Sequence, residues 1–425
     1  MLSSRGKRVL LVSGTSFPSI NAASARISAL ATKLAEKGHS VRVVSPMKLP
    51  KFKQTFNSRA EEYSVLQIMP VVPFSHVLVK ILNMMIAFFL AIVVLFTGEL
   101  GVIILSTPPW EVALGFNLAF LLFKTHWKRR VKMVYDHRDS IGDASDYKNF
   151  LRGIYAIDKH LLGFLLRVMS IVLKQSDLIV CTTEYQKNSL IEKGFDADKI
   201  KVIMNGADTK LFKPVDQKEK TTLRLKYKLP TNSFVLVVVS AGAWIYYRLE
   251  PVMAALRMLQ DSREFGGDLL LLIVGRWTRD LRTYFELAER LGIRDKVDYF
   301  GEIAREEMSN VLNTADVGIV PYSNSNFLKD TLPVKLFEYS SCQLPVIVTA
   351  PNNSIIESVV HKHELGLVCL PGDIECLAKA IEELYVNTEL RNKIRRNCRI
   401  AIEKEYNRAA LSEKYAILIE DVLAA

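Results

Sequence analysis

The sequence predicts an α/β protein built from two doubly wound domains that face each other across a cleft. Short apolar runs alternate with amphipathic helical stretches, as where "RVLLVSG" precedes "ASARISALATKLAEKGH" and "SVRVVSP". That order is a strand–helix–strand unit. The apolar runs are continuous in Val, Ile and Leu, which is typical of parallel strands buried on both faces. Further strand candidates in the first half are "GVIILSTPP", "VKMVYDHRD" and "SDLIVCTTE".

The same pattern restarts in the second half of the chain, after "KVIMNGADTKLFKP". We therefore predict a first domain over residues 1–210 and a second over residues 215–404. A helix over residues 405–425 is expected to pack back on the first domain. The strand candidates of the second domain are "SFVLVVVSAG", "DLLLLIVGR", "VDYFGEI", "DVGIVPY" and "LPVIVTA".

Length, composition and charge narrow the class of protein. The 425 residues suffice for two or three domains. With 49% hydrophobic and 24% charged residues, the chain is neither disordered nor a typical polytopic membrane protein. The net charge of +11 indicates an anionic partner, and no nucleic-acid motif accompanies it. Five cysteines without metal-ligand spacing are expected to be reduced thiols in a cytosolic setting.

The stretch "TLPVKLFEYSS", residues 331–341, combines a cation and a carboxylate. Lys335 and Glu338 are three residues apart, so on a helix they share one face. Thr331 is the expected N-cap, and Pro333 suits a first helical turn. A helix N-terminus with a nearby lysine is suited to a phosphate-bearing ligand. An ordinary surface ion pair is the alternative for these two residues taken alone.

An ordered set of motifs covering nearly the whole chain resembles the GT-B glycosyltransferases of family 4. In the second half it comprises "LLLLIVGR", "VDYFGEIAREEMSNVLNTADVGIVPY" and "TLPVKLFEYSSCQLPVIVTA"; in the first half, "LAEKGHSVRVVSP" and "SDLIVCTTEYQKNSL". "LPVKLFEY" is similar to the subgroup that modifies lipid-linked sugars in surface-polysaccharide assembly. The resemblance implies a retaining, hexosyltransferase-like enzyme that moves a sugar from a nucleotide-diphosphate sugar to a polyprenyl-linked or other membrane-associated glycan acceptor.

The resemblance also assigns roles on the donor side. The family typically has two acidic residues eight apart, which here are Asp330, one methylene shorter than the usual Glu, and Glu338. It implies that Glu338 binds the ribose hydroxyls, that Asp330 lies near the reaction centre, and that Lys335 stabilises the leaving diphosphate. No metal or other cofactor is required, and the triplet Asp196–Asp198 is expected to be a loop. The expected donor-binding set is Lys335, Glu338, Arg248, Gly242, Gly275 and Leu332.

The acceptor side is expected at "DHRDS" and at the loop after the first strand. Asp139, or alternatively His137, is expected to orient or deprotonate the acceptor hydroxyl; a structural pairing of Asp139 with Arg138 is the alternative. The catalytic set is thus Asp139, His137, Asp330 and Lys335. Asn21 and Ala22 stand where the family usually has two glycines. Arg26 matches a basic family position, with an ordinary surface arginine as its alternative. The acceptor-side set is Asn21, Ala22, Arg26 and Arg138.

Three apolar runs in the first half raise the question whether the protein binds or crosses a membrane. Residues 81–97, "ILNMMIAFFLAIVVLFT", are at the short limit for a spanning helix. A span there would separate strands of one sheet. We therefore predict peripheral, monotopic docking on the cytoplasmic face of a membrane; buried core helices are the alternative. Two other functions stay open, a GT-B sugar epimerase and a non-catalytic nucleotide-sugar-binding scaffold.

Overall fold

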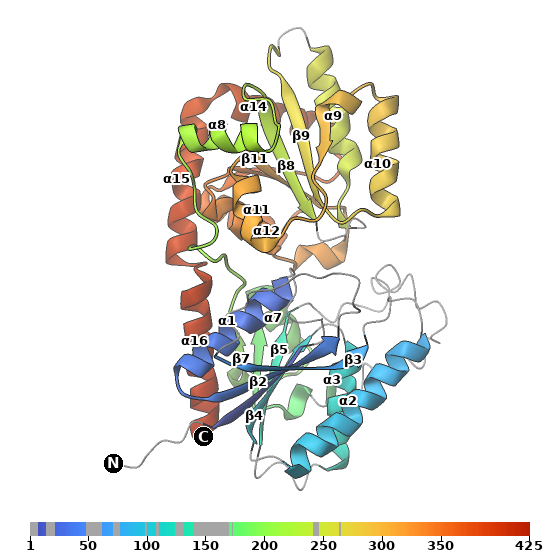
Figure 1. Ribbon diagram of the computed structural model, residues 1–425, viewed down its shortest axis with the longest axis vertical. Helices are drawn as coiled ribbons and strands as arrows, with labels where there is room; N and C mark the ends of the chain where they lie inside the picture. The colour runs from blue at the N-terminus through green and yellow to red at the C-terminus, as the bar shows by residue number, and fades with distance from the viewer. Residues whose placement is uncertain are drawn as a thin grey trace. The chain divides into compact units, whose positions relative to one another are not determined.

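The computed structural model describes residues 7–13, 22–47, 62–70, 77–97, 100–107, 110–123, 131–138, 170–171, 173–240, 246–262 and 265–425. The chain forms two compact units (Figure 1). Unit 1 comprises Met1–Met204 and Ala409–Ala425, and unit 2 comprises Asn205–Arg408. Each contains a parallel sheet with helices between its strands, so the predicted doubly wound α/β class is confirmed.

Unit 1 contains a seven-stranded parallel sheet in the order β3-β2-β1-β4-β5-β6-β7. The expected strands are present. The prediction missed β3, an edge strand, which lacks the continuous apolar run of a strand buried on both faces. The strands are β1 (Arg8–Ser13), β2 (Ser40–Met47), β3 (Ser64–Pro70), β4 (Leu100–Thr107), β5 (Lys132–His137), β6 (Leu178–Cys181) and β7 (Ile200–Val202).

Helices cover both faces of this sheet, because alternate residues along each strand point to opposite sides. Leu10 and Val12 of β1 pack in a core cluster with α2 and α3, whereas Val9 and Leu11 pack with α1 and the C-terminal helix α16. Figure 1 shows these two helical layers flanking the sheet. The helices are α1 (Ala22–Glu36), α2 (Val77–Thr97), α3 (Trp110–Leu122), α7 (Glu184–Glu192) and α16 (Arg408–Ala424).

The helices α2 and α3 approach each other closely. Ala87 and Ala91 of α2 are fully buried in the core cluster that contains α3. A Cβ on Gly115 of α3 would lie 2.3 Å from the Met84 carbonyl oxygen and 2.7 Å from the Ala87 Cβ. Only glycine permits this separation. One face of α2 is therefore a packed protein interface. Within the described residues, no helix has both the length and the apolar character needed to cross a membrane.

Unit 2 contains a six-stranded parallel sheet in the order β10-β9-β8-β11-β12-β13. The strands are β8 (Phe234–Ser240), β9 (Leu269–Gly275), β10 (Val297–Tyr299), β11 (Val317–Pro321), β12 (Val346–Thr349) and β13 (Gly366–Cys369). The helices are α8 (Gln217–Lys226), α9 (Leu249–Asp261), α10 (Arg279–Arg290), α11 (Arg305–Leu312), α12 (Val334–Ser341), α13 (Ile355–His363), α14 (Ile374–Val386) and α15 (Thr388–Lys404). The prediction missed β13, another edge strand.

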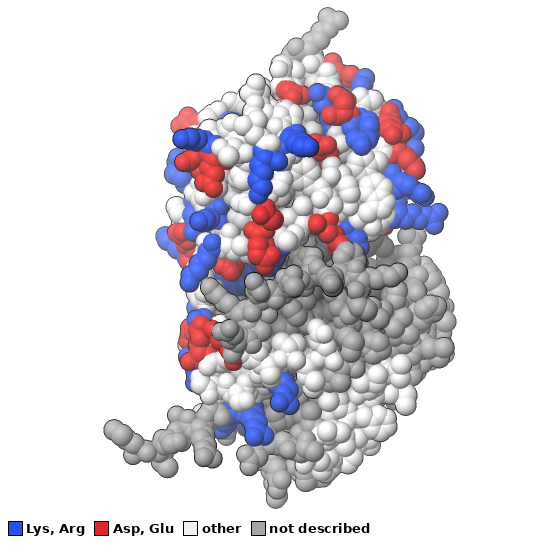
Figure 2. All heavy atoms as spheres, viewed as in Figure 1, with Lys and Arg blue, Asp and Glu red and all other residues white. Residues whose placement is uncertain are grey.

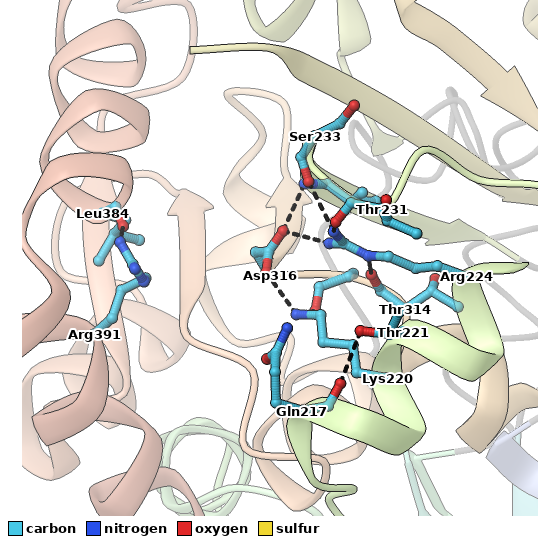
Figure 3. Close-up of polar contacts among 12 residues, drawn as sticks. Gln217, Lys220, Thr221, Arg224, Thr231, Ser233, Thr314, Asp316, Leu384 and Arg391 are labelled. Atoms are coloured by element: carbon cyan, nitrogen blue, oxygen red, sulfur yellow. Dashed lines mark hydrogen bonds and ion pairs between the residues drawn. The ribbon is translucent and has the colours of Figure 1, made fainter.

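A buried ion network anchors α8 at the amino edge of this sheet (Figure 3). Asp316, directly before β11, pairs with Lys220 and with Arg224, whose Nη2 lies 2.7 Å from Oδ2. The backbone N–H of Val235 in β8 also donates to this carboxylate, at 2.7 Å. Burial alone would raise the pKa of Asp316, but the two cations outweigh it and lower the pKa. Since ligands of such sheets bind at the opposite, carboxyl edge, this network is structural.

One cysteine pair corrects the expectation of five reduced thiols. Cys369 at the end of β13 and Cys376 in the first turn of α14 form a disulfide. Cys181, Cys342 and Cys398 are free and buried. Burial raises the pKa of each of these three thiols to about 12, so they remain protonated at neutral pH and are poor nucleophiles.

Candidate active site

The helix α12, which carries Lys335 and Glu338, is held firmly on the sheet of unit 2. The Tyr339 ring lies against Gly318 of β11, where an added Cβ would come within 2.4 Å of the ring. The Tyr339 hydroxyl accepts a hydrogen bond from the Val239 N–H of β8 at 2.9 Å. These contacts fix the orientation of α12, which follows β11 along the chain. The carboxyl ends of the strands form the edge of the sheet where ligands bind.

The start of α12 differs from the prediction. The N-cap is Pro333, which makes no side-chain capping bond, and the first helical residue is Val334. The expected cap at Thr331, with Pro333 inside the first turn, is therefore wrong. Thr331 lies two residues before the cap, too early for its hydroxyl to accept from the first turn. Pro333 thus offers no side-chain cap to the first N–H groups of the helix, and a helix terminus of this kind is suited to an anion.

Lys335 and Glu338 share one face of α12, as their spacing predicts. Lys335 Nζ lies 2.8 Å from Glu338 Oε2, and Arg305 Nη1 of α11 lies 3.5 Å from Oε1. The Glu338 side chain is 2% exposed, and that of Lys335 is 24% exposed. Burial alone would raise the pKa of Glu338, but Lys335, Arg305 and Arg408 outweigh it and lower the pKa. Glu338 is thus a buried carboxylate held ionised by cations.

This arrangement leaves acceptor capacity on Glu338. A carboxylate has about four lone-pair positions, and the two closest cations take one on each oxygen. The remaining positions could accept from a diol. Arg305 also keeps a buried donor, because its Nη2 has no hydrogen-bond partner among the described residues. Sequence reasoning missed Arg305, because nothing local to "AREEM" links it to a carboxylate on another helix.

The carboxyl ends of β8 and β9 meet at Gly275. Its φ is +142°, and an added Cβ would lie 1.8 Å from the Ser240 carbonyl oxygen, so only glycine fits. The Gly275 N–H donates to the Gly301 carbonyl oxygen at 2.7 Å, and the Tyr299 hydroxyl donates to the Gly275 carbonyl oxygen at 2.8 Å. The chain beyond β9 is thereby held close to the segment "YFGEI". Trp277, two residues after Gly275, is half exposed and stacks on Phe285.

The remaining donor-side candidates differ in exposure. Asp330 and Leu332 are buried just before α12. Arg248 is the N-cap of α9, and its N–H donates to the Pro321 carbonyl oxygen at 2.8 Å. Its side chain is 58% exposed and pairs with Glu250 at 3.1 Å. Gly242 lies outside the described residues. Their donor-binding roles stay predictions.

In unit 1 the end of β5 carries a buried charge pair. Asp136 Oδ1 lies 3.0 Å from both Nε and Nη2 of Arg26, and Ser106 Oγ donates to Oδ2 at 2.8 Å. The Arg26 Nη1 also donates to the Ile203 carbonyl oxygen at 2.9 Å. Arg26 is 7% exposed, so the surface-arginine alternative is wrong. Its guanidinium, which we expected on the acceptor side, is bound to protein groups, with the Tyr415 ring of α16 at 5.3 Å.

The neighbouring candidates have different surroundings. His137 is 2% exposed. Burial, with a contribution from Lys193, lowers the pKa of His137 to about 4 against the opposing effect of Asp136, so the ring is neutral at physiological pH. The Arg138 carbonyl oxygen accepts from Thr182 Oγ1 and Gln186 Nε2, both at 3.0 Å. Ala22 is exposed at the start of α1, and Asp139 and Asn21 lie outside the described residues.

Comparison with known protein families agrees with this geometry. Residues 219–400 match the family described as glycosyl transferases group 1, and residues 23–211 match glycosyltransferase family 4. The two matches together span nearly all of both units. The chain belongs to the family 4 glycosyltransferases. The predicted resemblance is thereby confirmed.

Two curated relatives of this chain illustrate the range of the family. It is 24% identical over 206 residues to the D-inositol 3-phosphate glycosyltransferase of Mycolicibacterium smegmatis, covering 46% of this chain and 44% of the relative. It is 25% identical over 216 residues to a GDP-mannose-dependent alpha-(1-6)-phosphatidylinositol monomannoside mannosyltransferase of Mycobacterium tuberculosis. This match covers 50% of this chain and 54% of the relative. The chain spans about half the length of these curated relatives.

A solved structure shares the fold over the full length. Anabaena HepE in complex with UDP-glucose superposes with a TM-score of 0.68 at 16% identity, covering 98% of this chain and 100% of that one. At this identity the likeness establishes the architecture alone. The GT-B fold predicted for the chain is confirmed.

Proposed function

We propose that this protein is a retaining glycosyltransferase that moves a sugar from a nucleotide-diphosphate sugar to a polyprenyl-linked or other membrane-associated glycan acceptor. The observation that carries the donor half is the group of charges on α12. Lys335 is a partly exposed cation, 2.8 Å from a buried carboxylate. Both follow a helix start whose N-cap, Pro333, makes no side-chain capping bond, at the carboxyl edge of a parallel sheet. A nucleotide diphosphate presents the two groups that such a site binds, phosphate and a ribose diol.

The chemistry follows from where charge develops. The bond between the sugar C1 and the diphosphate oxygen breaks, the acceptor oxygen bonds to C1, and the acceptor proton is lost. Negative charge therefore grows on the diphosphate. The α12 N-terminus and Lys335 stabilise that charge without a metal ion. Glu338, held ionised, accepts hydrogen bonds from the ribose hydroxyls. Asp330 is assigned to the neighbourhood of the sugar.

On the acceptor side we assign the base role to Asp139, with His137 as the alternative. Neutral imidazole can accept a proton, and the lowered pKa keeps His137 neutral. Its burial, however, favours a positioning role beside the Arg26–Asp136 pair. Arg26, Arg138, Asn21 and Ala22 are proposed to shape this side.

The relatives' names support the substrate classes. HepE holds UDP-glucose, and the mycobacterial mannosyltransferase is named for GDP-mannose and for a phosphatidylinositol mannoside, which is a membrane glycolipid. We therefore propose a nucleotide sugar as donor, an acceptor anchored in the cytoplasmic leaflet, and a peripheral location on that membrane for the synthesis of a surface polysaccharide.

The test is a panel of UDP-, GDP- and TDP-sugars, added with EDTA, with the melting temperature as the readout. We expect one nucleotide class to raise the melting temperature, because a ligand that binds only the native state stabilises it. EDTA should not abolish this shift. Absence of any shift would contradict the proposal. Release of a free epimerised sugar would identify an epimerase, and binding without turnover on any lipid acceptor would identify a scaffold.

A further inference from the structure

The helix α2 exposes one apolar stripe along its length. Five large apolar side chains, at intervals of three and four residues, are 48–58% exposed: Leu82, Met85, Phe89, Val93 and Phe96. At these intervals they lie on one side of the helix, and they extend over about 21 Å of its axis. Within this segment the only strongly polar side chain is Asn83, and the only charged residue of α2 is Lys80.

The opposite side of α2 is an ordinary protein interface. Ala87 and Ala91 are fully buried, and Ile86, Phe88, Leu90 and Ile92 pack against the same core cluster. A helix fixed in this way to a soluble-type core cannot be surrounded by lipid. It can, however, present its outer stripe to the surface of a membrane while lying in the membrane plane.

The net charge of the protein lies in the same unit as the stripe. Unit 1 carries 28 Lys and Arg residues against 18 Asp and Glu, whereas unit 2 carries 28 against 27. Almost all of the surplus of +11 therefore belongs to the unit that contains α2. Among the atoms that Figure 2 describes, those over the part of unit 1 where Figure 1 places α2 are white, which marks residues without charge. An uncharged stripe on a basic unit is complementary to an anionic membrane surface.

We infer that the outer stripe of α2, defined by Leu82, Met85, Phe89, Val93 and Phe96, inserts into the headgroup and acyl boundary of an anionic phospholipid bilayer. A protein partner is a poorer fit, because protein interfaces carry about one hydrogen bond per 100–200 Å² and this stripe offers almost no donors or acceptors. Lipid chains require none. The inference rests on the proposed membrane-associated acceptor, for which it supplies the surface that brings the enzyme to its substrate.

The experiment is flotation of the full chain with vesicles of phosphatidylcholine and phosphatidylglycerol, without any sugar substrate. Phe89→Glu should lower the partition coefficient by roughly tenfold or more, since a buried Phe is replaced by a charge. High salt should release part of the wild type, because screening weakens only the charge attraction, and alkaline carbonate should release most of it. Phe88 is unsuitable for this test, because it packs against the core.

The matched control is Leu225→Glu, at a 65% exposed apolar position on α8 of unit 2. It should float like the wild type. If Phe89→Glu proves unfolded by circular dichroism, Phe89→Trp replaces it as the decisive variant. The emission of the introduced indole should shift to shorter wavelength when vesicles are added and should be quenched by brominated acyl chains.

Three results would overturn the inference. One is a wild type that does not float. Another is a Phe89→Glu variant that is folded and floats like the wild type, or a Phe89→Trp variant whose emission is indifferent to lipid. The third is a wild-type dimer in light scattering that Phe89→Glu dissociates without any lipid binding, which would assign the stripe to a second copy. Sugar transfer to a detergent-dispersed lipid acceptor separates the two claims: transfer without flotation refutes the stripe alone, and flotation without transfer refutes the proposed function alone.

Discussion

The two units share one architecture but differ in what they present to their surroundings. Both are parallel sheets covered by helices on two faces. In unit 2 the exposed large apolar side chains are scattered over many elements and its charges nearly balance; in unit 1 five of them line one helix and the charge is strongly positive. Scattered exposed apolar residues are normal, whereas a contiguous stripe indicates a binding surface. The shared fold accounts for the similar cores, and the different surfaces are consistent with the different partners proposed above, a membrane for unit 1 and a nucleotide sugar for unit 2.

The units also differ in how they stabilise buried charge. In unit 2 two carboxylates, the partly buried Asp316 and the buried Glu338, each have at least two nearby cations. In unit 1 the buried carboxylate of Asp136 pairs with one cation, Arg26, and the adjacent His137 is buried in its neutral form. The two units should therefore respond differently to loss of a carboxylate and to acid.

The largest expected effect concerns the Asp316 network of unit 2. Asp316→Asn leaves Lys220 and Arg224 buried without their counter-ion, and removing one partner of a buried pair typically costs about 3–5 kcal/mol. Urea unfolding followed by circular dichroism should show this loss of stability. Asp295→Asn, at a 72% exposed side chain, is the control and should be nearly neutral. Equal effects of the two changes would mean that the network contributes nothing beyond a surface pair.

The second prediction concerns acid and unit 1. Because burial lowers the pKa of His137 to about 4, the unfolded chain binds a proton below pH 6.5 that the folded chain does not. Stability should be fully present above pH 6.5 and fall by about 3 kcal/mol as the pH approaches 4. The lowered pKa values of Asp316 and Glu338 change the stability of the protein only below about pH 4.5, where those groups begin to protonate in the unfolded chain.

The measurement is the urea midpoint between pH 7 and pH 5 for the wild type, His137→Gln and His363→Gln. Burial also lowers the pKa of His363 in unit 2, where Glu405 opposes it, so its variant controls for that contribution. His137→Gln should remove most of the pH dependence. An unchanged slope in this variant would show that His137 is not the group that destabilises the protein in acid.

The smallest expected effect concerns the donor site. Lys335→Met should weaken nucleotide-sugar binding by about 1–3 kcal/mol, because a charged hydrogen-bond donor is lost and Glu338 loses its closest cation. Lys226→Met removes the equivalent lysine from an exposed pair with Glu307 and should change binding by less than about 1 kcal/mol. Isothermal titration of both variants tests the difference, and identical affinities would remove Lys335 from the donor site.

The cores were more predictable than the site. Central strands buried on both faces appear as runs of Val, Ile and Leu, whereas the edge strands β3 and β13 do not, and both were missed. The spacing of Lys335 and Glu338 was sufficient to predict their pairing. The spacing of Cys369 and Cys376, seven residues apart, did not by itself predict their disulfide. No local pattern could place Arg305 beside Glu338 or Arg26 beside Asp136. Contacts between elements distant in sequence follow from the fold, and hydrophobic periodicity does not encode them.

The central claim is that unit 2 binds a nucleotide sugar whose sugar the enzyme transfers to a membrane lipid. The most direct measurement is incubation of the protein with bacterial membrane lipids and the radiolabelled nucleotide sugar that raises its melting temperature, followed by extraction into organic solvent. We predict label in the organic phase, in the presence of EDTA, and loss of that label in Glu338→Gln. Label that stays in the aqueous phase, whether as intact donor or as free sugar, would contradict the account.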